Sequence, residues 1–495
     1  MRVEMDTRAK ITHLLNRLGL GANEQEIDAL MPYGADGAAR KLINYEHTPD
    51  RFPVDPTELV LHDRDANVSL EPHRYALWWI LRMAATQRPL EEKMTLFWHN
   101  HFAVSGAKVE FGPAMLDYLN ILRKHAVGNF SELTYEISRS PAMLHWLDAE
   151  ISHKTHPNEN FGRELMELFT LGIGNYTEKD VKEVSRCFTT WGVRYPYYEL
   201  GKMPERDKVM KMSDADMPMI AFTECPYLAD TGPKTVLGVT RRFDDKSMIQ
   251  FLCENPITAK RLMKKLWAFM AYENPEDKVV DHLANKFVAS KLEMKPVLAE
   301  MVSMPEFWSD RAVGTMIKSP VSFTIGAMRQ FKVGEHFLGM RAQGATYETP
   351  LNAQLVGQLY GAFTLLHNQG LAPLFPPDVS GWRWGSAWVG ASAMLERQRI
   401  ANYLYNGTKQ GRISSKWIRP LNEAAKGKDS EWLVDRVCET MTITLPKAQK
   451  DALVESMKKK GVDVALKDPK AKTPPALIVQ PLIRVLAASP EYQLC

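Results

Sequence analysis

The chain has little cysteine and no long apolar run. Its five cysteines are far apart among 495 residues and form no CxxC pair, which argues against a zinc ribbon and, because their number is odd, against a disulfide framework. No stretch reaches the roughly 18 apolar residues of a transmembrane helix. The sequence therefore predicts a chain with reduced thiols and no membrane span.

A secretory signal is also missing from the start of the chain. The first ten residues, MRVEMDTRAK, are polar and contain no apolar core of a signal peptide. This pattern predicts a cytoplasmic protein. A chain from which a signal had been removed would show the same pattern, so export stays open as an alternative.

Neither sign of charge is in strong excess. The 62 Lys and Arg residues face 59 Asp and Glu residues, which gives a net charge of +3. Because the two signs of charge nearly cancel, the protein has no strong positive electrostatic field that would drive nucleic-acid binding on its own. We therefore expect no nucleic-acid partner. Hydrophobic residues make up 45% of the chain, as in globular proteins, which excludes a disordered or collagen-like chain.

Apolar residues recur at intervals of three and four, as in the run Ile11, Leu14, Leu15 and Leu18. This is the period of an amphipathic helix. Residues 195–245 differ, because Pro, Gly, Tyr and Asp accumulate there around short segments with a strand-like composition. The pattern predicts a mainly α, bundle-like single large domain with a small irregular or β-hairpin insert.

We expect four parts along the chain. An N-terminal helical core with the His, Glu and Arg motifs covers residues 1–194, and the insert covers residues 195–245. A helical region with a Trp-rich loop at about 370–390 covers residues 246–410. Residues 411–495 form a C-terminal helical segment whose many lysines indicate a solvated face rather than a binding patch.

Two histidines, His99 and His101, lie at the end of an apolar helix in the run WHNHF. Burying an imidazole costs free energy unless each ring nitrogen has a partner. Positions i and i+2 point about 200° apart on a regular helix, so the rings converge on one ion only if the helix ends there. The residues are therefore either hydrogen-bonded structural histidines or metal ligands.

A second polar group lies in the helix predicted from Asn158 to Leu171. Glu164 and Glu167 share a face of this helix, and Arg163 lies four residues before Glu167, so an intrahelical ion-pair ladder explains them without a ligand. The alternative is that Glu164 faces inward, toward the histidines.

Carboxylate and imidazole together suit zinc, iron or manganese, and helix-borne Glu and His ligands build metal sites in bundles. We therefore predict a divalent metal site formed by His99, His101 and Glu164. The run of residues 158–171 contains no ExxH, so the standard di-iron pattern is absent.

A third polar cluster surrounds the helix expected to start after Thr177, and capping explains part of it. We predict that Glu167 or Glu178 is a general base whose pKa is raised by burial. Arg163 would hold an anionic group, and Arg186 would bind substrate.

The Trp-rich loop, PPDVSGWRWGSAW at residues 376–388, is the fourth polar piece. Its tryptophans are either a core plug or a platform on which a sugar or peptide stacks. We predict that Trp382, Trp384 and the nearby Arg397 bind substrate.

Together these pieces resemble a widespread bacterial family known as domain of unknown function 1800. The resemblance extends over about residues 10–405. It implies a mainly α-helical protein and no established reaction. Because members are often encoded beside a sulfatase-like protein, it also implies a nearby protein partner and chemistry of the cell envelope. The matching stretches are HLLNRLGLG, EKMTLFWHNHF, HAVGNFSEL, SPAMLHWLD, NENFGRELMELFTLGIGNYTEKDVKEVSR, KSPVSF and PPDVSGWRWGSAWVGASAMLERQRIANYL.

Our first hypothesis is a metal-dependent, hydrolase-like enzyme that acts on a polar polymer such as an envelope glycan or peptide, with the metal activating the attack. The second is a non-catalytic helical scaffold or chaperone-like partner of a secreted protein. A third is a metal-free hydrolase or transferase that uses carboxylates alone.

Overall fold

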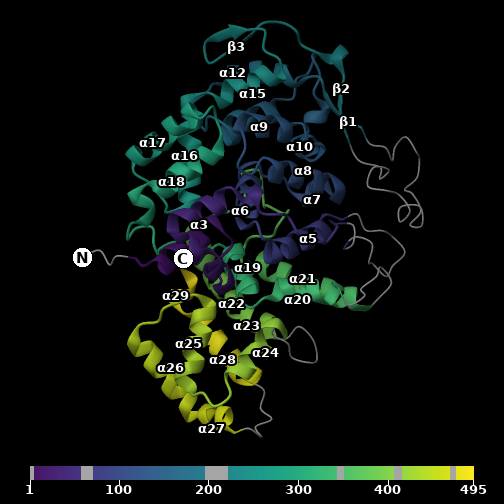
Figure 1. Cartoon of the computed structure of the whole chain (residues 1–495). Coiled ribbons are helices and arrows are strands. Elements are labelled where there is room, and N and C mark those ends of the chain that lie inside the picture. Colours follow the sequence, from purple (N-terminus) through teal and green to yellow (C-terminus); the bar gives the residue numbers. More distant parts are fainter. Residues whose placement is uncertain are drawn as a thin grey trace.

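The period of the apolar residues corresponds to a fold built largely from helices. The computed structural model describes residues 5–56, 59, 71–194, 221–342, 350–405, 415–468 and 475–495. Within these residues the chain is a mainly helical single domain with two small two-stranded sheets (Figure 1). The predicted fold class is confirmed.

Helices of the N-terminal part of the chain lie in the upper and middle part of Figure 1, where α15 to α21 (residues 245–368) also lie. Several begin at caps that the sequence shows, such as Asn23, whose side chain accepts a hydrogen bond from the Glu26 amide. The helices are α1 (Thr7–Leu18), α2 (Glu24–Leu30), α3 (Gly34–Ile43), α5 (Pro72–Ala85), α6 (Pro89–His101), α7 (Gly106–Val109), α8 (Gly112–Lys124), α9 (Phe130–Ser138), α10 (Pro141–Trp146), α11 (Glu159–Glu164) and α12 (Glu178–Ser185).

The strands occur around the predicted insert. Strand β1 (Trp191–Arg194) pairs antiparallel with β2 (Ala221–Glu224), with Trp191 opposite Glu224. Strand β3 (Lys234–Val236) pairs antiparallel with β4 (Val239–Arg241). Strand β1 begins before residue 195, where the insert was predicted to start. Residues 195–220 of that insert lie outside the described residues.

The second half of the chain is again helical, and α24 to α28 lie together at the bottom of Figure 1. The helices are α15 (Asp245–Cys253), α16 (Pro256–Met270), α17 (Asp277–Ala289), α18 (Met294–Ser303), α19 (Pro320–Gln330), α20 (Val333–Ala342), α21 (Pro350–Asn368), α22 (Ala391–Gln398), α23 (Ile400–Tyr405), α24 (Ser415–Ala424), α25 (Ser430–Met441), α26 (Lys447–Lys459), α27 (Val462–Lys467), α28 (Pro475–Ala488) and α29 (Pro490–Gln493).

Helices α5, α6 and α19 form the centre of the core. Every residue of α19 is buried, and every residue of α6 except Asn100 is buried. Helix α6 packs on α8, and α5 packs on α8, α19, α20 and α21. Polar side chains on α6 are therefore inside the protein, where each must be matched by a partner or by a ligand.

One buried charge on α6 is fully matched. The carboxylate of Glu92 accepts hydrogen bonds from Trp79 Nε1 at 2.7 Å and Arg123 Nε at 2.8 Å, and it also pairs with Arg82. Burial alone would raise the pKa of Glu92. The positive charges and hydrogen bonds of Arg123 and Arg82 outweigh this effect and lower the pKa to about 2. This cluster fixes α5, α6 and α8 relative to one another.

The helix predicted from Asn158 to Leu171 changes form partway. Helix α11 ends at Glu164 and continues as a π-helical turn, Leu165–Phe169. The chain then leaves the helix at Gly172, whose φ of 87° lies in the region that favours glycine. The π-helical turn points carbonyl oxygens of this segment toward side chains of α6 and α16. These hydrogen bonds are part of the candidate site.

None of the helices in the described part of the chain is long and apolar enough to cross a bilayer.

Candidate functional site

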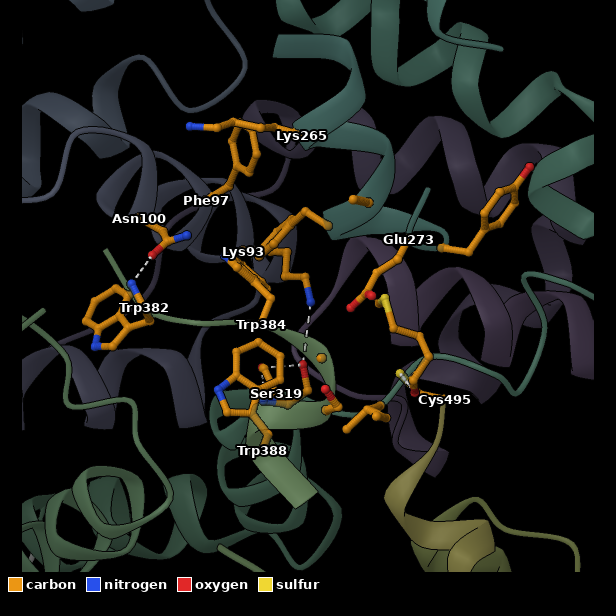
Figure 2. Close-up of a pocket in the computed structure, with 18 of the residues that line it drawn as sticks. Lys93, Phe97, Asn100, Lys265, Glu273, Ser319, Trp382, Trp384, Trp388 and Cys495 are labelled. Carbon is orange, nitrogen blue, oxygen red and sulfur yellow. Dashed lines mark hydrogen bonds between the residues drawn. The ribbon is translucent and has the colours of Figure 1, made fainter. Parts of the chain in front are cut away.

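One cavity combines aromatic walls with two lysines, of which one is buried and one is partly buried. Its volume is about 570 Å³, and Figure 2 shows it between α6, α16, the start of α19 and the Trp-rich loop. We call it the lysine–tryptophan cavity. It is lined by Lys93, Phe97, Asn100, His101, Lys265, Ala268, Phe269, Tyr272, Glu273, Thr315, Met316, Ile317, Ser319, Ser322, Ser380, Trp382, Trp384, Gly385, Ser386, Trp388 and Cys495.

The side chain of Asn100 holds the Trp-rich loop against α6. The Oδ1 atom of Asn100 accepts a hydrogen bond from the Trp382 amide at 2.7 Å. Gly381 has a φ of 83°, and a Cβ on it would lie 2.7 Å from the Asn100 carbonyl oxygen. Only glycine fits there, because a larger residue would both clash and be strained. The one position of α6 that is only partly buried is thus an anchor of the loop.

Further along the loop, Trp384 forms part of the cavity wall. Its ring meets the Phe269 ring edge-on at 5.0 Å and the Trp388 ring at 5.2 Å. Gly385 has a φ of 60°, and a Cβ on it would overlap the Glu273 carboxylate. Trp384 is 37% exposed, so part of the residue is open to solvent.

Lys93 points from α6 into the middle of the cavity, beside Ser319 and Trp384 (Figure 2). The residue is 3% exposed. Its Nζ donates a long hydrogen bond of 3.5 Å to Ser322 Oγ and lies 4.9 Å from the centre of the Phe269 ring. The pKa of Lys93 is lowered to about 8, mainly because the amine is buried. The acidic group of Cys495 raises this pKa, and the positive charge of Arg17 lowers it.

Lys265 occupies another part of the cavity, beside Phe97 (Figure 2). Its Nζ lies 3.4 Å from His101 Nδ1. Since His101 Nε2 donates to the Phe169 carbonyl oxygen at 3.0 Å, the Nδ1 atom is the acceptor in a neutral ring. Burial, with help from the nearby Arg261 charge, lowers the pKa of Lys265 to about 7.

Among the described residues, no carboxylate forms a salt bridge with Lys93 or Lys265. Glu273 and Cys495 also line the cavity, and the acidic group of Cys495 acts on Lys93 only from beyond salt-bridge distance. Buried ammonium groups are normally paired, because an unpaired one loses its hydration without compensation. The cavity therefore carries positive charge that an anion can match.

His99, predicted as a metal ligand, is fully occupied by the protein. Tyr118 donates its hydroxyl hydrogen to the Phe102 carbonyl, so His99 Nδ1 donates to the Tyr118 oxygen at 2.8 Å. The other nitrogen, Nε2, accepts from the Leu374 amide at 3.1 Å. Burial lowers the pKa of His99 to about 3, which keeps the ring neutral. His99 is therefore a hydrogen-bonded structural histidine, which was the alternative to a metal ligand.

The structure does not bring the predicted metal ligands together. Both ring nitrogens of His99 and His101 have protein partners. In the described part of the chain, no group of three or more His, Cys, Asp or Glu side chains is arranged to hold a metal ion. Glu164 is half-buried, and burial together with Glu167 raises its pKa.

The predicted general bases and Arg163 lie outside the cavity lining. Glu178 is exposed and takes two hydrogen bonds from Arg163, at 2.6 and 2.7 Å. These bonds lower the pKa of Glu178, so the expectation that burial raises it was wrong. Glu167 accepts a hydrogen bond of 2.6 Å from the Tyr176 hydroxyl.

The predicted substrate-binding residues divide into two pairs. Trp382 and Trp384 both line the cavity, but Trp382 is 4% exposed and packs edge-on against His99, so it plugs the core. Arg186 instead pairs with Asp230 and Glu183 and ties the insert to α12. Arg397 is fully buried and donates to the Lys318 carbonyl at 2.6 Å and to the Gln493 side chain, outside the cavity lining.

The sequence did not predict that Lys93 and Lys265 line the site, nor that Asn100 anchors the Trp-rich loop. One signal was present: Lys93, Phe97, Asn100 and His101 recur at helical spacing and so share a face of α6. A lysine in that pattern normally indicates a solvated position, and the burial comes from segments far away in the sequence.

Comparison with known proteins gives one match. The family model for "Protein of unknown function (DUF1800)" matches residues 13–494, so the chain belongs to that family. No curated protein and no solved structure matches the chain.

Proposed function

We propose that this member of the DUF1800 family binds an acidic sugar unit, free or at the end of a polar polymer, in the lysine–tryptophan cavity. The observation that carries the proposal is a pair of cavity lysines, the buried Lys93 and the partly buried Lys265, neither of which forms a salt bridge with a carboxylate among the described residues. A carboxylate of the ligand would supply the missing negative charge.

The walls and size of the cavity support a sugar ring. Aromatic faces such as that of Trp384 stack on the apolar faces of sugars, and serine hydroxyls bind their hydroxyl groups. A volume of about 570 Å³ lies within the range of small-ligand sites. An acidic glycan of the envelope, as in our first hypothesis, offers such units, and the proposal keeps that substrate class without the metal.

A titration with two matched sugars tests the proposal. Methyl glucuronide and methyl glucoside share a ring and differ in the carboxylate, and quenching of tryptophan fluorescence follows binding. We expect the acid to bind at least about tenfold more tightly, because a charge-assisted hydrogen bond contributes about 1.5–3 kcal/mol. Lys265→Met should remove most of this preference, and Lys264→Met, which changes an exposed neighbour on α16, should leave it unchanged.

Equal affinity for the two sugars, or no binding of either, would contradict the proposal. The absence of any ligand would favour the second hypothesis, a non-catalytic scaffold for a secreted partner, which stays a prediction.

A further inference from the structure

We propose that Lys93 forms an imine with the carbonyl group of the acidic ligand, so that the protein acts on the open-chain aldehyde of a uronic acid or a similar oxo acid. This inference rests on the proposed function, because the same cavity must first bind the anion. It names a reactive atom, Lys93 Nζ, and a chemical class of substrate, an acidic carbonyl compound.

The surroundings of Lys93 distinguish it from the other lysine of the cavity. Lys265 Nζ is engaged with His101 Nδ1 and lies near the Arg261 charge, which suits it to hold a carboxylate. Among the described residues, the hydrogen-bond and ring contacts of Lys93 Nζ are a serine hydroxyl at 3.5 Å and the face of the Phe269 ring at 4.9 Å. An amine that is desolvated in this way is readily neutral and nucleophilic.

Two serine hydroxyl groups lie beside the reacting position. Ser319 Oγ donates to Ser322 Oγ at 3.1 Å, and Ser322 in turn faces Lys93 Nζ. Figure 2 shows Ser319 on the side of the cavity where Trp384 and Trp388 form the wall. A carbonyl oxygen placed beside the two hydroxyl groups can take hydrogen bonds while the nitrogen attacks the carbon.

The step is balanced in atoms and charge. The neutral amine attacks the carbonyl carbon, a C–N bond forms, and the carbonyl oxygen leaves as water. Overall, the ammonium of Lys93 and the aldehyde give a protonated imine and one water molecule, since two of the three ammonium protons end on the oxygen. The positive charge stays on Lys93 Nζ, and no oxidant or reductant is required.

Reductive trapping tests the inference directly. The full chain is incubated with glucuronic acid and cyanoborohydride near pH 7, digested, and analysed by mass spectrometry. We expect the adduct on Lys93 to form at least about tenfold faster than on exposed lysines such as Lys264, because more of its amine is neutral. Lys93→Arg and Lys93→Met should both lose this adduct while Lys264 keeps its slow background reaction.

Methyl glucuronide separates this inference from the proposed function, because its ring is locked and it has no free aldehyde. Binding of methyl glucuronide with no glucuronate adduct on Lys93 above the background would overturn the imine and leave the binding site standing. If methyl glucuronide fails to bind as well, both proposals fall. The comparison of Lys93 with Lys264 is made within one wild-type sample, so it holds even if a Lys93 variant fails to fold.

Discussion

Replacing Lys93 with methionine should stabilise the protein near neutral pH. The ordinary pKa of lysine is 10.5, and burial lowers that of Lys93 to about 8. The difference of about 2.5 corresponds to about 3 kcal/mol, at about 1.36 kcal/mol for each pKa unit. This is the free energy that the folded state loses by burying the charged amine, and Lys93→Met removes it while keeping a long side chain.

The effect has a defined pH dependence. Below pH 8 the lysine is charged in both the folded and the unfolded state, so wild type carries the full cost. As the pH rises from about 8 to about 10.5, the folded protein loses the proton first and the cost disappears. The advantage of Lys93→Met should therefore be up to about 3 kcal/mol near pH 7 and close to zero near pH 10.5.

Urea unfolding followed by tryptophan fluorescence measures this difference at several pH values. The exposed Lys264→Met serves as the control and should stay within about 0.5 kcal/mol of wild type throughout. Two results would contradict this prediction. One is a Lys93→Met protein that is less stable than wild type near pH 7, and the other is a difference in the free energy of unfolding that does not change with pH. Either result would mean that protein contacts compensate the buried ammonium.

Two further substitutions test the frame around the cavity. Gly381→Ala adds a Cβ 2.7 Å from the Asn100 carbonyl oxygen at a positive φ, so we expect a strain of about 1–3 kcal/mol and a methyl glucuronide affinity lowered by about tenfold, measured by fluorescence titration. Glu92→Gln should cost about 3–5 kcal/mol in urea unfolding near pH 7, because it removes the carboxylate that pairs with buried Arg123. Arg82 loses one partner but keeps its ion pairs with Asp50 and Glu91. Since the pKa of Glu92 is lowered from 4.5 to about 2, wild type should keep its greater stability over Glu92→Gln above pH 4.5 and lose it as the pH falls toward 2. A difference in stability that grows in acid would contradict this assignment.

Local signals in the sequence predicted the fold class and several helix starts. Asn23 caps α2, and Thr177 forms a capping box with Asp180 at the start of α12, because a cap depends on residues three apart. The π-helical turn after Glu164 was not predictable in this way. Whether that segment forms i→i+4 or i→i+5 hydrogen bonds depends on its packing against other helices.

The candidate site was predictable only in part. The sequence indicated that imidazoles at His99 and His101 need partners, and it singled out Trp384 as an element that can meet a ligand. It could not show that the partners are Tyr118 and the Leu374 amide for His99 and the Phe169 carbonyl for His101, because these groups come from distant segments. The same holds for the burial of Lys93, which α16, α19 and the Trp-rich loop complete together.

The most direct test of the central claim is the number of protons taken up when methyl glucuronide binds. Titration calorimetry near pH 8, in two buffers with different ionisation enthalpies, gives this number. At that pH Lys265, with a pKa of about 7, and Lys93, with a pKa of about 8, are partly neutral, and a bound carboxylate favours their charged forms. We expect uptake of about one proton per ligand, and much less in Lys265→Met. Binding without proton uptake would contradict the claim that these two lysines receive the acid.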